Sequence, residues 1–599
     1  MKIRNIIYML ACLSLTGCYS LDREPEDSLS SAVPFKTTDE MSSYLNQFYE
    51  SAVIGQGFMA GGGGGIAGNE VNSDNLAGSS VDQRLAGRTS IASASTLGNY
   101  SYIRNVNFLL NNLDNCVNKE TSAYSQAVGE AYFFRAYYYY RMFINYGPLA
   151  WVDKPLDPDY EQMKLPRENR TVIADHIIAD LQMAAENLLP VNSCASMRVH
   201  RDVALALLSE VALFEGTWEK NHKAKNTPFY DPTVTDAKIA EYLRTAADAA
   251  KQVMDRGVWK IYSTGNTLND YRYIFQEANL SGNPEILWYK RYDGDVIGNS
   301  VNRYLNVGGG GVGPTASLID DYLTIDGRPY LGEEKMQGKI TWGVELSPEV
   351  RDPRLCQTIA TTGQQLRPDQ APYNLPPLTG ASAWAYTTSG YSMLKHVQTD
   401  YTGNLDAEYK GATPAIQVRY ADVLLNYAEA LAELDGSANA QNIINAIRPL
   451  RERVGMPDMD FDREYNTDSE YPFANLDKYV QAVRRERRVE TAFENKRLTD
   501  ILRWAAADVL IKGKFHRGIL FIGSNLETDS RYSDIKYDVD RPSIYLTGQP
   551  GDKYRYIIPT NPTGYESGWQ FRLDQDYLLP IQDRMISLTE GLWYQNPGW

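Results

Sequence analysis

The strongest hydrophobic pattern in the chain lies within residues 418–455. Apolar residues recur there at intervals of three and four positions, and polar residues occupy the opposite side of the same helix. The apolar positions are Ala421, Leu424, Leu425, Ala428, Leu431 and Ala432, and the polar positions are Asp422, Asn426, Glu429 and Glu433. The pattern predicts an amphipathic helix with one buried face and one face in water.

A turn and a second helix follow in the same stretch. Asp435 and Gly436 are typical helix-stop and turn residues. After them, four apolar residues again repeat at helical intervals, namely Ile443, Ile447, Leu450 and Val454. The two helices would fold back on each other, and a hairpin of this kind cannot bury its apolar faces without neighbours.

Comparable patterns predict further helices along the chain. They lie at residues 40–49, 99–113, 123–146, 171–189, 199–220, 236–256 and 476–510. The aromatic stripe within residues 123–146 is interpreted as packing, because aromatic residues at helical spacing usually face a core. Sequential pairing through short loops is typical of a helical-repeat scaffold, although no strict period of about 34 residues is visible. We therefore expect a mainly α fold.

The pattern changes in the middle of the chain. Residues 258–414 are rich in Gly, Pro, Asn and scattered aromatics, with a strand-like piece at 285–289, and residues 514–570 are similar. Glycine runs at 61–65 and 308–311 show no helical or strand period. A flexible surface loop is one interpretation of them. Long irregular loops are also disproportionately functional, so this texture marks the best candidate for a binding surface.

The first residues carry a secretory signal pattern. Lys2 and Arg4 precede an apolar run over 6–15, and residues 15–18 read L-T-G-C, which has the form of a bacterial lipobox. A short buried helix and a transmembrane span are the alternatives, but the run is too short to cross a bilayer. We expect cleavage before Cys18, lipidation of that cysteine and attachment to a membrane through acyl chains.

These patterns divide the chain into four segments. Residues 1–17 are the expected signal peptide, and residues 18–34 form an acidic, proline-broken tether. Residues 35–257 form an N-terminal helical part and residues 258–599 a C-terminal part. Because the later helices can complete the stack that the earlier ones begin, we expect both parts to form one intertwined globule.

Charge argues against a nucleic-acid partner. The chain has 59 basic and 75 acidic residues and a formal charge of −16, whereas phosphate binding needs a concentrated basic surface. The run R-R-E-R-R at 484–488 could suggest such a surface. Arg and Glu interleave from there to Glu494, however, which favours a helix joined to its neighbours by ion pairs.

The sequence contains no recognisable catalytic or metal-binding motif. The five cysteines show no metal-ligand spacing, and the five histidines (His176, His200, His222, His396 and His516) share no local pattern, so each is interpreted as a surface or capping residue. We expect no cofactor. Structural calcium would suit Asp- and Asn-rich loops, but no D-x-[DN]-x-[DN]-G loop indicates it. Glycoside hydrolysis stays open, because a pair of carboxylates meets only in the fold.

Four segments together resemble the SusD/RagB family of surface glycan-binding lipoproteins. They are residues 133–149, 418–455, 484–504 and 577–599, and with the lipobox they follow the family's order. The chain departs from the family pattern at four scaffold positions, which are Pro449, Val454, Asn495 and Leu498. These departures affect local packing more than function.

The resemblance implies a fold, a location and a partner. The fold would contain tetratricopeptide-like helix pairs, with a loop-rich region and a few short strands carrying the ligand site. The protein would face outward from the outer membrane on its lipid anchor and bind an oligosaccharide or polysaccharide without cleaving it. Its partner would be a SusC-like TonB-dependent transporter. The alternatives are a helical-repeat protein-interaction adaptor, a peptide-binding importer subunit and a glycoside hydrolase.

Six residues are candidates for the ligand site by their position. Sugar rings stack on aromatic faces, and their hydroxyls need polar groups at the rim. The candidates near the first glycine run are Arg84, Asn99 and Tyr100, and those in the loop-rich middle are Tyr292, Trp342 and Trp384. For each residue the alternative is ordinary packing or a solvent-exposed ring.

Overall fold

The computed structural model describes residues 33–57, 64–156, 164–382 and 384–599. The expected signal peptide, Cys18, nearly all of the tether and part of the first glycine run lie outside these residues. Among the helices of the described residues, none is long and apolar enough to span a bilayer.

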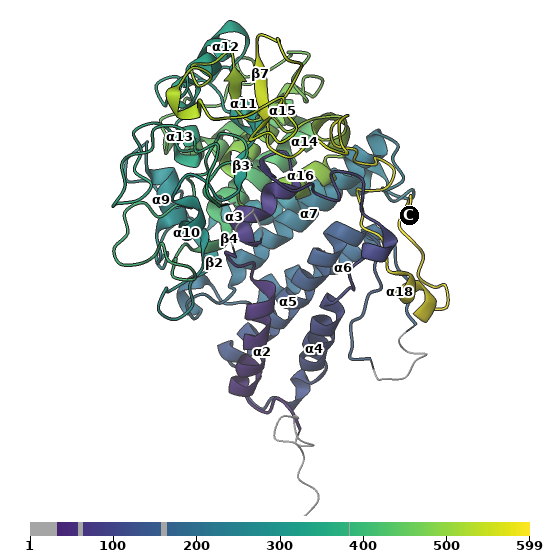
Figure 1. Cartoon of the computed structure of the whole chain (residues 1–599). Helices are drawn as coiled ribbons and strands as arrows, with labels where there is room; N and C mark the ends of the chain where they lie inside the picture. The colour runs from purple at the N-terminus through teal and green to yellow at the C-terminus, as the bar shows by residue number, and fades with distance from the viewer. Residues whose placement is uncertain (1–32, 58–63, 157–163, 383) are drawn as a thin grey trace, which may run out of the picture.

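Long helices of the N-terminal part pack side by side (Figure 1). They are α2 (Thr38–Ala52), α4 (Asn99–Asn111), α5 (Ser122–Tyr146), α6 (Arg170–Asn187), α7 (Arg201–Ala224) and α8 (Asp236–Asp255). Threonine hydroxyls accept hydrogen bonds from the first-turn amides of three of them, at Thr37, Thr121 and Thr235. From α4 to α8, each helix contacts the next one in the chain, which confirms the predicted pairing.

The predicted hairpin is present as α14 (Tyr420–Glu452). Asp435, with φ −165° and ψ 91°, interrupts the helix at the predicted turn. The apolar face packs against α7 and α8, so the hairpin does find the neighbours that it needs. The helix also contacts α15 (Lys478–Glu490) on its other side.

The prediction of a wet face on this helix was wrong. Its four polar positions, Asp422, Asn426, Glu429 and Glu433, are all at most 5% exposed. The arginines of the later helices cover them, because Arg484 Nη2 lies 2.8 Å from a carboxylate oxygen of Glu433 and Arg487 Nε lies 2.6 Å from one of Glu429. The polar face is therefore covered by side chains of opposite charge and is not exposed to water.

The single helix predicted over residues 476–510 is three helices. They are α15, α16 (Arg497–Arg503) and α17 (Ala507–Leu510). The chain turns between the first two because Phe493 and Asn495 adopt left-handed backbone conformations, with φ of 63° and 62°. The turn aims the carboxylate of Glu494 back into the interior, where it meets Arg419.

Ion pairs fill the interior where α14, α15 and the loop-rich part meet. We call the following group the buried ion-pair network: Glu285, Arg354, Arg419, Arg451, Arg453, Glu486, Glu490 and Glu494. Each side chain in it is at most 6% exposed. The interpretation of this run as an ion-paired helix is thus confirmed for residues 484–490, whereas Glu494 forms its ion pair from the turn after α15.

Short strands and helices make up the loop-rich part, seen at the upper left of Figure 1. Three small antiparallel sheets pair β1 (Leu76–Gly78) with β3 (Val312–Pro314), β2 (Ile286–Lys290) with β4 (Ala415–Arg419), and β7 (Arg555–Ile558) with both β5 (Leu520–Ile522) and β6 (Tyr545–Leu546). The short helices there are α3 (Gly65–Gly68), α9 (Asp270–Gln276), α10 (Val301–Leu305), α11 (Ala316–Asp321), α12 (Gly332–Ile340) and α13 (Arg354–Thr358), while α18 (Asp583–Leu588) lies apart from them at the lower right of Figure 1. The strand predicted at 285–289 is confirmed as β2.

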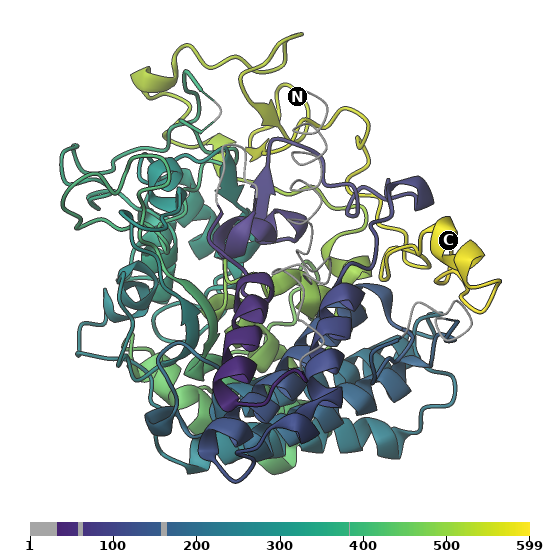
Figure 2. The ribbon, with the colours of Figure 1, turned by 90° about the horizontal axis from the view of Figure 1, so that it is seen from below.

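Distant segments share one core. The largest group of buried apolar side chains runs from Phe35 to Trp593, and a second group lies beneath the loops around α10, α11 and α13. The pairing of β1 with β3 carries the N-terminal segment into the loop-rich part. Figure 2 shows the long blue helices on one side of the molecule and the loops, from teal to yellow, on the other.

Four of the five histidines are buried, so the surface alternative was wrong for these four, although His200 occupies the N-cap position of α7. His200, His222 and His396 each place a ring nitrogen within 3.0 Å of a backbone carbonyl oxygen. Burial lowers the pKa of His222 to about 3 and that of His396 to about 4, so both rings are neutral at neutral pH. His516 is buried as well, while the side chain of His176 is 40% exposed.

Candidate functional site

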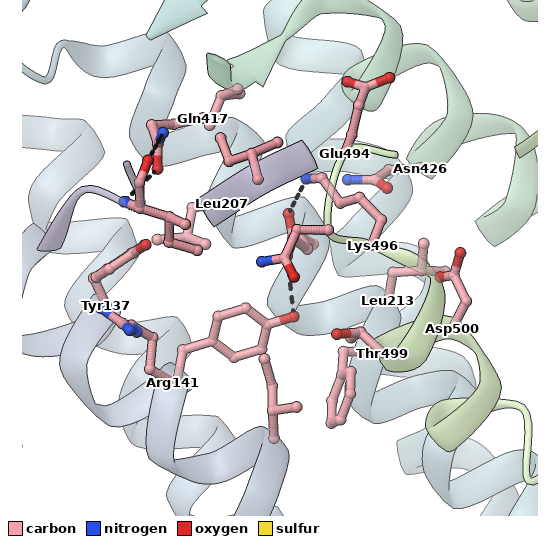
Figure 3. Close-up of a pocket in the computed structure, with 18 of the residues that line it drawn as sticks. Tyr137, Arg141, Leu207, Leu213, Gln417, Asn426, Glu494, Lys496, Thr499 and Asp500 are labelled. Atoms are coloured by element: carbon pink, nitrogen blue, oxygen red, sulfur yellow. Dashed lines mark hydrogen bonds and ion pairs between the residues drawn. The ribbon is translucent and has the colours of Figure 1, made fainter. Parts of the chain in front are cut away.

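A cavity of about 160 Å³ lies between α5, α7, the beginning of α14 and the segment that follows α15 (Figure 3). The carboxylate of Glu210 accepts hydrogen bonds from Tyr140 Oη and Lys496 Nζ, both at 3.3 Å. The amide of Gln417 bonds both the N–H and the carbonyl of Ile54. The polar groups of this cavity therefore bond mainly to one another.

Ion pairs in the same cavity hold several elements of the scaffold together. Burial by itself would lower the pKa of Lys496, but Asp422 and Glu210 more than offset that effect, so its pKa is raised and the ammonium stays charged. Lys496 thus ties the segment after α15 to α7 and α14. A ligand would have to break these contacts in order to enter.

A more open group of side chains lies in the loop-rich part. We call it the Trp384 surface, and it comprises Arg303, Tyr304, Trp384, Tyr386 and Glu408. The rings of Tyr304 and Trp384 lie 6.2 Å apart at a near-perpendicular angle, and the Arg303 guanidinium lies 4.5 Å from the Trp384 ring. Tyr304 Oη donates a hydrogen bond to Glu408 at 3.1 Å. Both rings are partly exposed, and the Arg303 guanidinium lies over one face of the Trp384 ring.

The second glycine run holds this surface in place. The N–H of Gly310 donates to the carbonyl oxygen of Trp384 at 2.7 Å, and the N–H of Gly311 donates to that of Tyr386 at 3.1 Å. A Cβ atom at Gly309 would collide with the backbone of residues 384–386. Glycine is required there because the two loops approach each other so closely.

Tyr409 extends the surface toward solvent. Its side chain is 64% exposed, and its φ of 58° places a bulky residue in the left-handed region. Such a conformation costs about 1–2 kcal/mol for a residue other than glycine. Val296 and Ile297 are also exposed, on a neighbouring loop whose Gly298 packs against the backbone of Tyr409. An exposed aromatic ring on a strained backbone suggests a functional constraint.

Three of the six residues proposed from the sequence lie among the helices and the C-terminal tail. Arg84 is buried, and its guanidinium donates to the carbonyl oxygens of Asp576 and Tyr577 at 2.8 and 2.9 Å. Burial lowers its pKa to about 10. Asn99 donates to the carbonyl of α5 residue Tyr138, and Tyr100 Oη donates to the carbonyl of Ala150 at 2.9 Å. All three make packing contacts in this structure, and their role in binding stays a prediction.

The other three lie in the loop-rich part but do not meet. Tyr292 is 6% exposed, and its hydroxyl accepts a hydrogen bond from the N–H of Gln56, just before the first glycine run. Trp342 is partly exposed and donates its indole N–H to the carbonyl of Asn374 at 3.0 Å. Trp384 forms the centre of the surface described above. Among the described residues, no hydrogen bond or ring contact joins any two of these three.

Sequence reasoning missed the neighbours of Trp384. Tyr304 lies four positions before the first glycine of the run at 308–311, so proximity to that run could have identified it. Glu408 and Tyr409 carry no such signal, because only the fold brings them to residues about a hundred positions earlier. In the part of the chain that the structure describes, no cluster of three or more His, Cys, Asp or Glu side chains could hold a metal ion.

Helix pairs that support a loop-rich, aromatic surface define the class of this protein, and the chain belongs to the SusD family. The model of that family matches residues 272–599, and a second model, described as "Starch-binding associating with outer membrane", matches residues 21–213. The resemblance stated from the sequence is therefore confirmed.

Individual relatives agree with this assignment. The chain is 24% identical to SusD-like protein P2 of Formosa agariphila over the full length of both chains. It is 22% identical to SusD-like protein P25 of the same organism over 68% of each chain.

Solved structures share the fold. A SusD-like protein from Bacteroides fragilis superposes with a TM-score of 0.69 at 21% identity, covering 96% of this chain and 100% of that one. A SusD-like carbohydrate binding protein from the same species gives 0.67 at 20% identity, covering 93% and 99%. The predicted mainly α fold with tetratricopeptide-like helix pairs is thus confirmed.

Proposed function

We propose that this protein captures an oligosaccharide at the Trp384 surface and does not cleave it. The observation that carries the proposal is the pair of partly exposed rings, Tyr304 and Trp384, with a guanidinium over one ring and a carboxylate bonded to the hydroxyl of the other. Pyranose rings present C–H faces that pack on aromatic rings, while charged side chains bond the hydroxyls at the rim. The carbohydrate-binding relative in B. fragilis supports the same class of ligand.

The chemistry of the surface supports binding rather than hydrolysis. Glycoside hydrolysis uses two carboxyl groups on opposite sides of the scissile bond. The aromatic pair here contacts one carboxylate, Glu408, and one cation, Arg303. A cation beside a carboxylate bonds sugar hydroxyls well, but it does not supply the second carboxyl group.

Retardation in native gels that contain different polysaccharides tests the proposal directly. The wild-type protein should be retarded by at least one polysaccharide, and calorimetry with its oligosaccharides should then give the affinity. Trp384→Ala should weaken binding at least tenfold, since aromatic residues at the centre of a site contribute about 2 kcal/mol or more. Tyr465→Ala provides the control, because Tyr465 is a similarly part-exposed ring that contacts Leu476 elsewhere on the molecule.

Two outcomes would overturn parts of this proposal. Chromatographic detection of shortened sugars after incubation would show an enzyme. If the wild type bound a protein or peptide and Trp384→Ala bound it equally well, the protein-interaction adaptor or the peptide-binding importer subunit would be favoured instead.

We further propose that the captured sugar passes to a SusC-like TonB-dependent transporter. Family membership and the outer-membrane association in the name of the N-terminal family model support this part. Lipidation of Cys18 would hold the protein on the outer face of the membrane. The test is to solubilise outer membranes and purify a tagged wild-type chain. A TonB-dependent transporter should co-purify with it, and Cys18→Ala should leave the membrane fraction. Recovery of the tagged wild-type chain without a transporter would refute the partnership.

A further inference from the structure

A second cavity, of about 200 Å³, lies on a different part of the molecule and is not used by the function proposed above. It is enclosed by α11, α12, α15 and α17, by residues 466–472 and by residues 514–517, and it shares no lining residue with the Trp384 surface. Exposed side chains such as Lys514 and Arg517 lie on its wall, so it opens to solvent. At about 30 Å³ of liquid volume per water, it has room for about seven water molecules.

Two polar side chains on the wall lack a hydrogen-bond partner among the described residues. His516 is only 7% exposed, yet neither of its ring nitrogens is paired, and the hydroxyl of Tyr471 is also unpaired. The other buried histidines behave differently, because each bonds a backbone carbonyl. Buried polar atoms without partners are rare and unfavourable, so these atoms point to something that occupies the cavity.

The buried charged groups on the wall are paired with one another. Asp74 contacts Arg488 at 2.9 Å, Arg488 also contacts Asp321 at 2.6 Å, and Asp320 contacts Lys335 at 2.7 Å. Five carboxylic and four cationic side chains line the cavity, so their charges nearly cancel. With the deepest charges paired and the total nearly balanced, the cavity favours a neutral ligand over an anion or a cation.

The unpaired atoms define what such a ligand must offer. Burial lowers the pKa of His516 to about 4, so its ring is neutral and presents one donor and one acceptor. The tyrosine hydroxyl can donate and accept. Neighbouring hydroxyl groups on a small ring meet all of these requirements, because each hydroxyl is both a donor and an acceptor.

We propose that this cavity is a second ligand site, which binds one neutral, polyhydroxylated molecule the size of a single sugar ring through His516 and Tyr471. The inference stands on the cavity and its unpaired atoms, and it does not depend on the Trp384 surface. A single sugar ring held here would be separate from the chain of sugars that the loops capture.

Calorimetry with small free ligands tests the site. The probes are D-glucose, D-galactose, D-mannose, L-rhamnose, D-xylose and myo-inositol, each titrated into the full-length protein at pH 7. At least one should bind saturably at one site per chain. Tyr471→Phe removes only the hydroxyl and should weaken that binding at least tenfold, while His516→Phe should abolish it.

Two controls separate this site from its surroundings and from the Trp384 surface. Tyr465 lies just before the segment 466–472 that lines the cavity, and its hydroxyl is already bonded to the carbonyl of Leu476. Tyr465→Phe removes that hydroxyl, and small-ligand binding should not change. Trp384→Ala should also leave small-ligand binding unchanged while it loses polysaccharide. If His516→Phe fails to fold, Tyr471→Phe still decides the question.

Three results would overturn the inference. One is the absence of saturable binding by every probe, with soaked crystals showing water only in the cavity. Another is equal binding by the wild type and Tyr471→Phe. The third is loss of small-ligand binding in Trp384→Ala, which would assign it to the loops. If no polysaccharide retarded the wild-type protein but a small ligand still bound, the proposed function would be refuted and the present inference would stand.

Discussion

The buried ion-pair network and the Trp384 surface use the same kinds of side chain for opposite purposes. In the network, Glu490 alone contacts Arg354, Arg419 and Arg453 at 3.0, 2.8 and 2.5 Å, and all of these side chains are shielded from water. On the surface, Arg303 lies over the partly exposed ring of Trp384, and Glu408 accepts a hydrogen bond from the hydroxyl of the partly exposed Tyr304. The difference teaches that a candidate binding surface is identified by polar and aromatic side chains that are still exposed. The density of charged residues alone does not identify one.

The largest expected effect comes from breaking the network. Glu490→Gln would leave three buried guanidinium groups short of one negative charge, and loss of one partner of a buried ion pair costs about 3–5 kcal/mol. We expect the free energy of unfolding in urea to fall by about that much, or the protein to become insoluble. Asp529→Asn, which breaks the exposed pair with Arg531, should cause no measurable change. A stable Glu490→Gln variant would show that the network is dispensable.

A smaller effect should follow from acid, because the network depends on ionised carboxylates. Burial alone would raise the pKa of Glu494, but Arg419 and Lys395 lower it to about 2, and Arg503 and Arg487 act in the same way on Glu429. A carboxylate with a lowered pKa stabilises the fold above its unfolded value of about 4.3 and loses that contribution as the pH falls toward 2.

Urea unfolding at several pH values measures this effect. Stability should begin to decrease below about pH 6.5, because the buried neutral histidines take up protons there only on unfolding, and it should decrease more steeply below about pH 4.3, where the carboxylates of the unfolded chain take up protons. The free energy of unfolding should therefore fall continuously as the pH is lowered, with its steepest part between pH 4.5 and pH 3. Unchanged stability over that interval would contradict the pKa directions given for the network.

The smallest effect should come from the edge of the Trp384 surface. Tyr409→Gly removes a ring and also relieves a left-handed backbone conformation, so the free energy of unfolding should rise by up to about 1 kcal/mol. Binding of long oligosaccharides should weaken a few-fold in calorimetry, while binding of short ones changes less. Tyr409→Asn is the matched control, since asparagine tolerates the same backbone and also lacks the ring. Unchanged binding in both variants would exclude Tyr409 from the site.

Periodic patterns predicted the helices well, because apolar spacing depends only on neighbours in the sequence. The same reasoning failed for Glu429 and Glu433, since it treats every charged face as wet and cannot see arginines that arrive from some 50 to 70 residues later. The break at residues 491–496 was also missed. Nothing in local composition marks Phe493 as left-handed.

The candidate site was predictable only in outline. Glycine-rich texture indicated the loops around Trp384, but its partner Glu408 comes from a separate loop that no local pattern connects to Tyr304. Arg84 and Tyr100 were chosen by position along the chain, whereas their contacts with backbone carbonyls depend on how the helices and the tail pack. Position in a sequence carries little information about which way a side chain faces.

The contact between Arg84 and the carbonyls of residues 576 and 577 also bears on the order of folding. It joins segments almost five hundred residues apart. Similarly, β1 can pair only after β3, more than two hundred residues later, is available. Contacts between such distant segments form slowly, because the chain must close large loops before it gains any stability from them. A nascent chain can therefore form its early helices but not close the fold until nearly all of it is available. During that interval the chain stays incompletely folded.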